Sequence, residues 1–134
     1  MSLGSWDPNA QVRAHHLNLE PSLLAQLIAY SANDHLENLA EVLKGEECQT
    51  LSGLMKLDHD AWNVAVENLS DEELLHLIRF LAVAENLPGW ESMEHSPVIP
   101  LAKSLRKRGS RLDKDFLRWL RSVNNNRFLP YGPL

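Results

Sequence analysis

The sequence LSDEELLHLIRFLAVAENLPGW, residues 69–90, decides the fold of this chain. Ser70 and Glu73 have the spacing of a capping box, in which the hydroxyl and the carboxylate satisfy free backbone N–H groups at a helix start. Pro88 disfavours helical geometry at Leu87, so the helix is expected to stop near Asn86. The stretch therefore predicts one helix over residues 70–86.

Apolar residues cover more than half the circumference of this predicted helix. They are Leu74, Leu75, Leu77, Ile78, Phe80, Leu81, Ala82 and Ala84. The remaining surface is a polar strip around Val83, formed by Glu72, His76, Arg79 and Asn86. A helix with so little polar surface is expected to be nearly surrounded by others. We predict that it is the central helix of the fold and that Ile78 and Leu81 are buried.

Helical spacing recurs on both sides of this stretch. The pattern predicts helices over residues 21–31, 34–44 and 59–68, a short helix within 46–57, a helix from Pro97 or Pro100 to Gly109, and a last helix that ends at residues 124–126. Asp34 with Glu37 is interpreted as an acidic cap of the second of these helices. Leu112 and Leu117 flank Asp113 as a hydrophobic staple of the last.

No stretch alternates apolar and polar residues over the length of a strand. The fold class is therefore all-α, a single compact bundle of about six helices around the central helix 70–86. We expect the domain to cover residues 20–134 and residues 1–19 to be flexible or irregular. The pair His15–His16 is interpreted as ordinary polar residues, because adjacent side chains diverge and chelate a metal poorly.

The composition indicates a cytoplasmic protein. A chain of 134 residues is long enough to bury a core without a covalent staple. The lone Cys48 cannot form an internal disulfide, and no secretory signal is visible. No apolar run approaches the length of a membrane span, so no membrane contact is expected.

The formal charge of −5 hides a polarity along the chain. Residues 1–102 carry 4 bases and 16 acids, a balance of −12, whereas residues 103–134 carry 9 bases and 2 acids, a balance of +7. Such asymmetry fits an anionic partner at the C-terminal end, and it fits equally an attraction between the two parts of one fold.

Motifs for catalysis or metal binding are weak. Glu73 and His76 have the spacing of helical metal ligands, but one copy is explained by a capping Glu beside an ordinary His. Nucleophile elbows and phosphate-binding glycine loops are absent from the sequence. We expect no catalytic residue, no metal and no cofactor.

Glu85 is the exception, because it projects from the centre of the apolar arc of the central helix, where an unpaired carboxylate is costly. We expect it to accept a hydrogen bond from an Arg of the segment 106–127. The alternative is a buried polar site, in which His76, Arg79 and Glu85 would bind a small ligand or act in an enzyme.

Basic residues gather on the two C-terminal helices. The candidates for a binding surface are Lys103, Arg106, Lys107, Arg111, Lys114, Arg118 and Arg121. Helices joined by residues 108–112 could form a helix-turn-helix that binds nucleic acid. The favoured alternative is internal neutralisation, in which Arg106, Arg118 and Arg121 point toward carboxylates of residues 34–73.

The chain closes on NRFLPYGPL, residues 126–134, which is unusually apolar for a chain end. Phe128, Leu129 and Tyr131 are expected to dock on a groove of the same domain or of a second copy, because Pro130 and Pro133 favour an extended conformation. Together with LPGWE, residues 87–91, this segment resembles small bacterial proteins of no assigned activity. The resemblance covers about the last half of the chain and implies a bacterial cytosolic origin.

The sequence thus predicts a non-enzymatic helical protein that acts through macromolecular interaction, with a protein partner or self-association. Nucleic-acid binding through residues 103–121 is one alternative. A small-ligand or enzymatic site near Glu85, His76 and Arg79 is the other.

Overall fold

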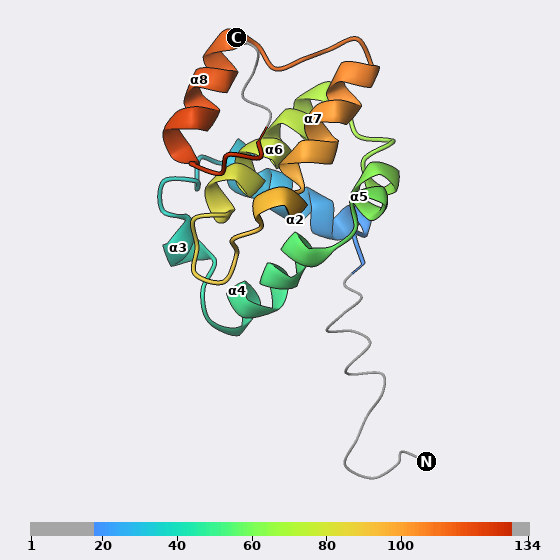
Figure 1. The fold of residues 1–134 in the computed structure, drawn as a ribbon. Helices are drawn as coiled ribbons and strands as arrows, with labels where there is room; N and C mark the ends of the chain where they lie inside the picture. Colours follow the sequence, from blue (N-terminus) through green and yellow to red (C-terminus); the bar gives the residue numbers. More distant parts are fainter. Residues whose placement is uncertain (1–17, 130–134) are drawn as a thin grey trace, which may run out of the picture.

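The computed structural model describes residues 18–129, and its regular secondary structure in that range is helical, with no strand (Figure 1). Its α-helices are α2 (Pro21–Ala32), α3 (Leu39–Val42), α4 (Gly45–Leu51), α5 (His59–Ala65), α6 (Asp71–Ala84), α7 (Val98–Lys107) and α8 (Lys114–Val123). Two 3₁₀ turns, η1 (Ser52–Lys56) and η2 (Met93–His95), lie between them. The predicted all-α class is confirmed. The expectations for residues 1–17, including His15–His16, and for Tyr131 lie outside the described residues.

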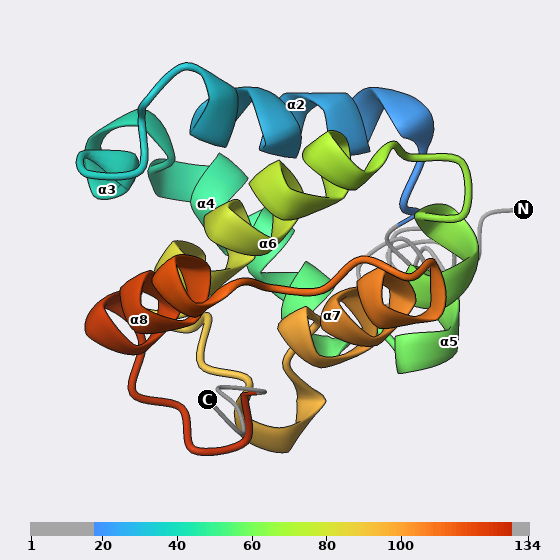
Figure 2. The same ribbon diagram turned by 90° about the horizontal axis from the view of Figure 1, so that it is seen from above.

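Helix α6 is the centre of the fold, as predicted. Figure 2 shows it between α2 on one side and α7 and α8 on the other, and these are the helices on which it packs. Ser70 and Glu73 form both hydrogen bonds of the capping box at its start. Ile78 and Leu81 are fully buried, with an exposed fraction of 0%. Burial on nearly all sides explains why so apolar a helix is stable here.

Helix α2 is the main packing partner of α6. Pro21 occupies its first turn, where a missing N–H costs nothing, and Leu24 and Leu27 face the core. Tyr30 near its end stacks on Phe80 of α6 with ring centroids 5.6 Å apart. This contact fixes the end of α2 beside the middle of α6.

The opposite side of α6 is covered by α7 and α8. Helix α7 packs on α5 and α6, and α8 packs on α6. Asp113 caps α8 by accepting a hydrogen bond from the backbone N–H of Phe116 at 2.7 Å, as the sequence predicted. One hydrophobic cluster contains residues from Leu24 to Leu129 and includes the buried rings of Trp62 and Trp90.

The predicted helix over residues 34–44 is wrong in most of its length. Only α3, a single turn at Leu39–Val42, is helical there. Asp34 has a φ of 62°, which a helix cap does not adopt, and it instead ends α2. The N–H of Asp34 bonds to Ser31 O and that of His35 to Tyr30 O, the bond pattern of a Schellman motif. The acidic pair at 34 and 37 therefore belongs to a helix stop.

Other boundaries differ by less. Helix α5 ends at Ala65 and not at residue 68, and the broken pattern of residues 46–57 forms α4 followed by η1. Helix α7 begins at Val98, directly after Pro97.

The C-terminal segment returns to the core after α8. Asn124 donates to Ala82 O at 2.8 Å, and Asn126 donates to Met93 O at 2.8 Å. Leu129 is buried, which confirms that this part of the tail docks on its own domain, whereas Phe128 is 39% exposed. Among the described residues, no helix has the length and apolar character needed to cross a membrane.

Candidate functional site

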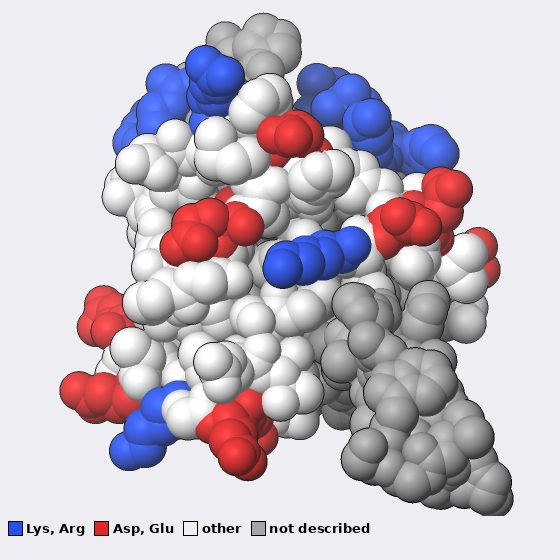
Figure 3. All heavy atoms as spheres, turned by 60° about the horizontal axis from the view of Figure 1, so that its bottom comes forward, with Lys and Arg blue, Asp and Glu red and all other residues white. Residues whose placement is uncertain are grey.

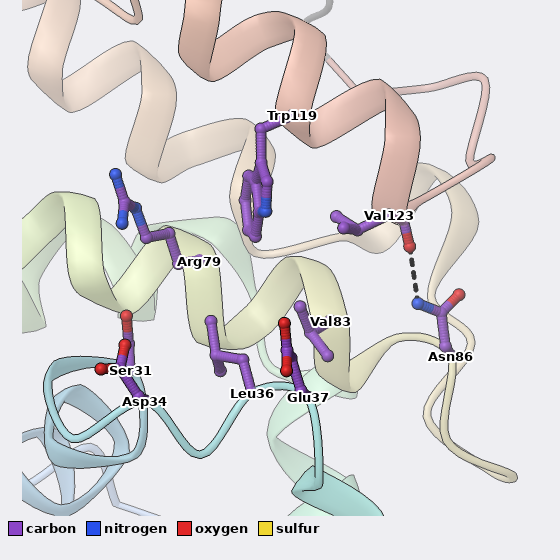
Figure 4. Close-up of a pocket in the computed structure, with 9 residues that line it drawn as sticks. All are labelled: Ser31, Asp34, Leu36, Glu37, Arg79, Val83, Asn86, Trp119 and Val123. Atoms are coloured by element: carbon purple, nitrogen blue, oxygen red, sulfur yellow. Dashed lines mark hydrogen bonds between the residues drawn. The ribbon is translucent and has the colours of Figure 1, made fainter.

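An open cleft of about 720 Å³ lies between the end of α2, α6 and α8 (Figure 4). We call it the α6–α8 cleft. Its lining residues are Ser31, Asp34, Leu36, Glu37, Arg79, Val83, Asn86, Trp119 and Val123. The volume is within the range of sites that bind small ligands or peptide side chains.

One wall of the cleft is the segment that follows α2. Because the Schellman motif turns the chain sharply at Asp34, residues 34–37 run beside α6 instead of continuing the helix axis. Figure 4 shows Leu36 and Glu37 pointing toward the cleft from this segment. Residues 34–37, which the sequence predicts as the start of a helix, therefore form the acidic wall of the cleft.

The floor is the polar strip of α6. Arg79, Val83 and Asn86 are three or four residues apart, so they share one face of the helix. Asn86 donates from its side-chain amide to Val123 O at 2.7 Å, and this bond joins the ends of α6 and α8 (Figure 4). The cleft is thus closed at one end by a defined contact.

Arg79 and Trp119 form the most distinctive part of the lining. The Arg79 guanidinium lies 5.2 Å from the ring centroid of Phe116 and 5.8 Å from that of Trp119, within the range of cation–π contact. Within residues 18–129 no acceptor receives a hydrogen bond from it. The two rings attract the guanidinium, and its N–H donors stay available to a ligand.

Charges of opposite sign lie on two sides of the cleft. In Figure 4 Arg79 extends from one side, and Asp34 and Glu37 lie on the other. Neither carboxylate forms an ion pair within 4.0 Å in the described part of the chain. Leu36, Val83 and Trp119 place apolar surface between the two charged sides.

A second cleft of about 330 Å³ adjoins the first. It shares Arg79 and Trp119 with the α6–α8 cleft and adds Leu75, Arg111, Asp113, Asp115 and Phe116. Because two side chains are common to both, the two clefts meet at the Arg79–Trp119 contact.

The predicted polar site of His76, Arg79 and Glu85 is not assembled. His76 and Glu85 are nine residues apart and project about 180° from each other on an α-helix. The His76 ring Nδ1 lies 2.9 Å from the Ser31 hydroxyl, Arg79 lines the cleft, and Glu85 does not. Arg79 is the member that lies in a candidate binding surface.

The predicted Arg partner of Glu85 is wrong. Glu85 is buried, with an exposed fraction of 6%, and its carboxylate accepts hydrogen bonds from the Ser96 hydroxyl and the Asn126 amide. Neutral donors from two loops satisfy it because the basic side chains of the C-terminal part point outward.

The basic candidates lie on the surface. Lys103, Arg106, Lys107, Arg111, Lys114, Arg118 and Arg121 are all exposed. On the face drawn in Figure 3, two groups of Lys and Arg side chains lie along the upper edge, with uncharged and acidic surface between them. Helices α7 and α8 pack on α6 and not principally on each other, so residues 103–121 do not have the compact packing of a helix-turn-helix.

Arg118 does not make the internal ion pair predicted for it, and Arg108 makes one instead. Arg118 pairs with Asp115 of its own helix at 3.2 Å, and not with a carboxylate of residues 34–73. Arg108 instead pairs with Asp71 at 3.1 Å and donates to the backbone oxygens of Val66 and Leu69. The acidic and basic parts of the chain meet at this contact.

Asp71 accepts two hydrogen bonds from the α7–α8 linker. The bond from the Ser110 hydroxyl and then the bond from Arg108 lower the pKa of Asp71 below its ordinary value of 3.8. The start of α6 is therefore linked electrostatically to residues 108–110.

Among the lining residues of the cleft, only Arg79 is a site residue predicted from the sequence. Asp34 is interpreted there as a cap, and Trp119, which is only partly buried, is not predicted as a site residue. Val83 was visible as an apolar residue within the polar strip of the central helix. That interruption is the signal that could have located the cleft.

Comparison with known proteins gives no relative for this chain. No family model, no curated protein and no solved structure matches it. In the described part of the chain, no group of three or more His, Cys, Asp or Glu side chains is arranged to hold a metal ion.

Proposed function

We propose that this protein is a non-enzymatic binding module that takes an extended segment of a partner protein into the α6–α8 cleft. The observation that carries the proposal is the placement of Trp119. Its ring lies partly exposed in an open cleft between opposite charges, whereas Trp62 and Trp90 are fully buried in the core.

This lining has the composition of a protein-binding surface. Trp and Arg are the residue types most enriched among those that contribute most to binding energy at interfaces. Trp119 offers a large rigid surface, and Arg79, stacked beside it, offers donors with little loss of side-chain entropy. A cleft that combines both is suited to one anchoring side chain of a partner.

An enzymatic role has one supporting contact, the hydrogen bond between Ser31 and His76 at the edge of the cleft. Ser31 is buried and lies in the last turn of α2, where the helix carbonyls oppose negative charge. No carboxylate among the described residues bonds to His76 to orient it as a base. These features support binding over acyl transfer.

Nucleic-acid binding through residues 103–121 remains a prediction. Helices α7 and α8 do not pack on each other as in a helix-turn-helix, and this gives it less support than the cleft gives to peptide binding. Self-association and a cytoplasmic location are likewise predictions that the cleft does not decide.

The experiment is a selection of binders from a library of random 12-residue peptides displayed on phage. We expect enriched peptides that bind the wild-type protein with micromolar affinity. Trp119→Ala should weaken that binding by about 30-fold, because loss of an aromatic anchor typically costs about 2 kcal/mol. Circular dichroism checks that the variant is folded.

The matched control is Phe128→Ala, since Phe128 is also an aromatic ring with exposed surface but does not line the cleft. This variant should bind the same peptides within about twofold of wild type. Enriched peptides that bind Trp119→Ala as well as wild type would contradict the proposal, and so would the absence of any enriched peptide.

A further inference from the structure

The charged residues that line the α6–α8 cleft limit which partner segments can bind there. Arg79 stands on one side, and Asp34 and Glu37 on the other, with no ion pair within 4.0 Å between them or with other described residues. A purely apolar segment would leave both charged sides facing an occupant that cannot pair with them. Burying charge without a partner is costly, so complementary charges on the occupant are favoured.

Arg79 presents the geometry of a carboxylate receptor. Its exposed guanidinium lies within cation–π distance of Phe116 and Trp119, and no acceptor among the described residues uses its donors. A guanidinium placed in this way can donate two parallel hydrogen bonds to one carboxylate. The corresponding group on the occupant is therefore an acidic side chain.

Asp34 and Glu37 present the opposite requirement. Both are exposed carboxylates on the wall that faces Arg79 across the apolar surface of Leu36 and Val83 (Figure 4). Asp34 and Glu37 together carry two negative charges and Arg79 carries one positive charge, so the lining has a net charge of −1. A basic side chain on the occupant would offset it.

The dimensions of the cleft limit how much of a partner it can contact. Arg79 and Asn86 mark its extent along α6, a rise of about 10 Å over seven residues. An extended chain covers that distance with about three residues. Successive side chains of an extended chain point to opposite sides, so neighbouring acidic and basic residues would reach the two charged walls.

We propose that the occupant is an extended partner segment of about three residues, in which an acidic and a basic residue are neighbours and an apolar residue stands beside them. The carboxylate binds Arg79, the cation binds Asp34 and Glu37, and the apolar side chain packs on Trp119. This inference rests on the proposed function, since it specifies the partner of the same cleft.

The test measures the charge requirement with the peptides obtained from the phage library. The enriched sequences should share the acidic, basic and apolar residues. Two analogues are then synthesised for the tightest binder, one with the acidic residue replaced by Gln and one with the basic residue replaced by Gln. Calorimetry gives their affinities for the wild-type protein, for Arg79→Gln and for the double variant Asp34→Asn with Glu37→Gln.

We expect each analogue to bind wild type about five- to tenfold more weakly than the parent peptide. The analogue without the acidic residue should bind Arg79→Gln as tightly as it binds wild type. The peptide carboxylate and Arg79 form one pair, so removing the second partner costs no further affinity. The analogue without the basic residue should likewise bind the double variant as tightly as it binds wild type. In the crossed combinations, the analogue without the acid is measured on the double variant and the analogue without the base on Arg79→Gln. There the two losses of binding free energy should add.

Asp34→Gly separates binding from folding. Glycine adopts a positive φ without strain, so this substitution should keep or raise stability while it removes one carboxylate. Asp34→Gly should bind the parent peptide about two- to fivefold more weakly than wild type does. Its affinity for the analogue without the basic residue should equal that of wild type.

The outcomes distinguish the two proposals. Peptides whose binding depends on Trp119 but is unaffected by either Gln replacement would contradict the charge requirement and leave the proposed function intact. If no enriched peptide depends on Trp119, both proposals are contradicted. Non-additive losses in the crossed combinations would contradict the assignment of each charge to its wall.

Discussion

At the scale of single residues, Glu85 shows how a carboxylate can lie inside an apolar surface without a cation. It occupies the end of α6, at the C-cap, where the Ser96 hydroxyl and the Asn126 amide reach it from two different loops. Asn126 also donates to Met93 O, and its side-chain oxygen accepts from Phe128 N–H. One buried carboxylate therefore joins α6, the segment before α7 and the C-terminal segment.

We predict that Glu85→Leu lowers the free energy of unfolding by about 2 to 4 kcal/mol, because two buried donors lose their acceptor. Glu85→Gln should cost about 1 kcal/mol, since the Gln side chain keeps an acceptor for Asn126. Urea denaturation followed by circular dichroism measures both values. Glu94→Leu, at an exposed carboxylate in the same loop region, is the control and should stay within about 0.5 kcal/mol of wild type.

A Glu85→Leu variant as stable as wild type would show that the two donors find other acceptors. The role assigned to Glu85 in holding the C-terminal segment would then be wrong.

At the scale of elements, the contact between the start of α6 and the α7–α8 linker replaces the helical hairpin that the basic sequence suggested. Arg108 donates to the backbone oxygens that follow α5 and pairs with Asp71 at the first position of α6. Ser110 adds a second hydrogen bond to the same carboxylate. The linker is thereby held against α6, and α7 and α8 follow separate paths over the core.

This contact predicts a pH dependence of stability. The pKa of Asp71 is lower in the folded chain than its ordinary value of 3.8, so the charged carboxylate stabilises the folded state above that pH. The contribution is lost as the pH falls through the folded-state pKa. Asp71→Asn removes the charge, so the melting temperature of wild type should exceed that of the variant at pH 6.

The two melting temperatures should converge as the pH falls below 3.8 and through the lowered pKa of Asp71. Asp115→Asn is a matched control, because its Arg118 pair is fully exposed and should contribute little at either pH. A difference between wild type and Asp71→Asn that does not shrink as the pH is lowered below 3.8 would contradict the assigned cause.

At the scale of the whole molecule, the sequence predicted the all-α class and the central helix because both depend on local signals. The capping box of Ser70 and Glu73 and the apolar arc of α6 need no knowledge of distant residues. The Asp113 cap and the burial of Ile78 and Leu81 follow in the same way.

The cleft could not be predicted because it depends on residues brought together from three parts of the chain. The error at Asp34 arises because Asp can cap the start of a helix and can also adopt the positive φ that ends one. Only the path of the chain after Tyr30, fixed by its stacking on Phe80, distinguishes the two. The partners of Glu85 were missed for the same reason, because Ser96 and Asn126 are polar loop residues with no local signal.

The most direct test of peptide binding in the α6–α8 cleft is a titration of ¹⁵N-labelled protein with the tightest selected peptide, followed through backbone amide chemical shifts. The account predicts that the largest changes fall in residues 31–37, 79–86 and 116–123, which contribute the lining. Changes concentrated in residues 103–107 of α7, with the cleft residues unaffected, would contradict it.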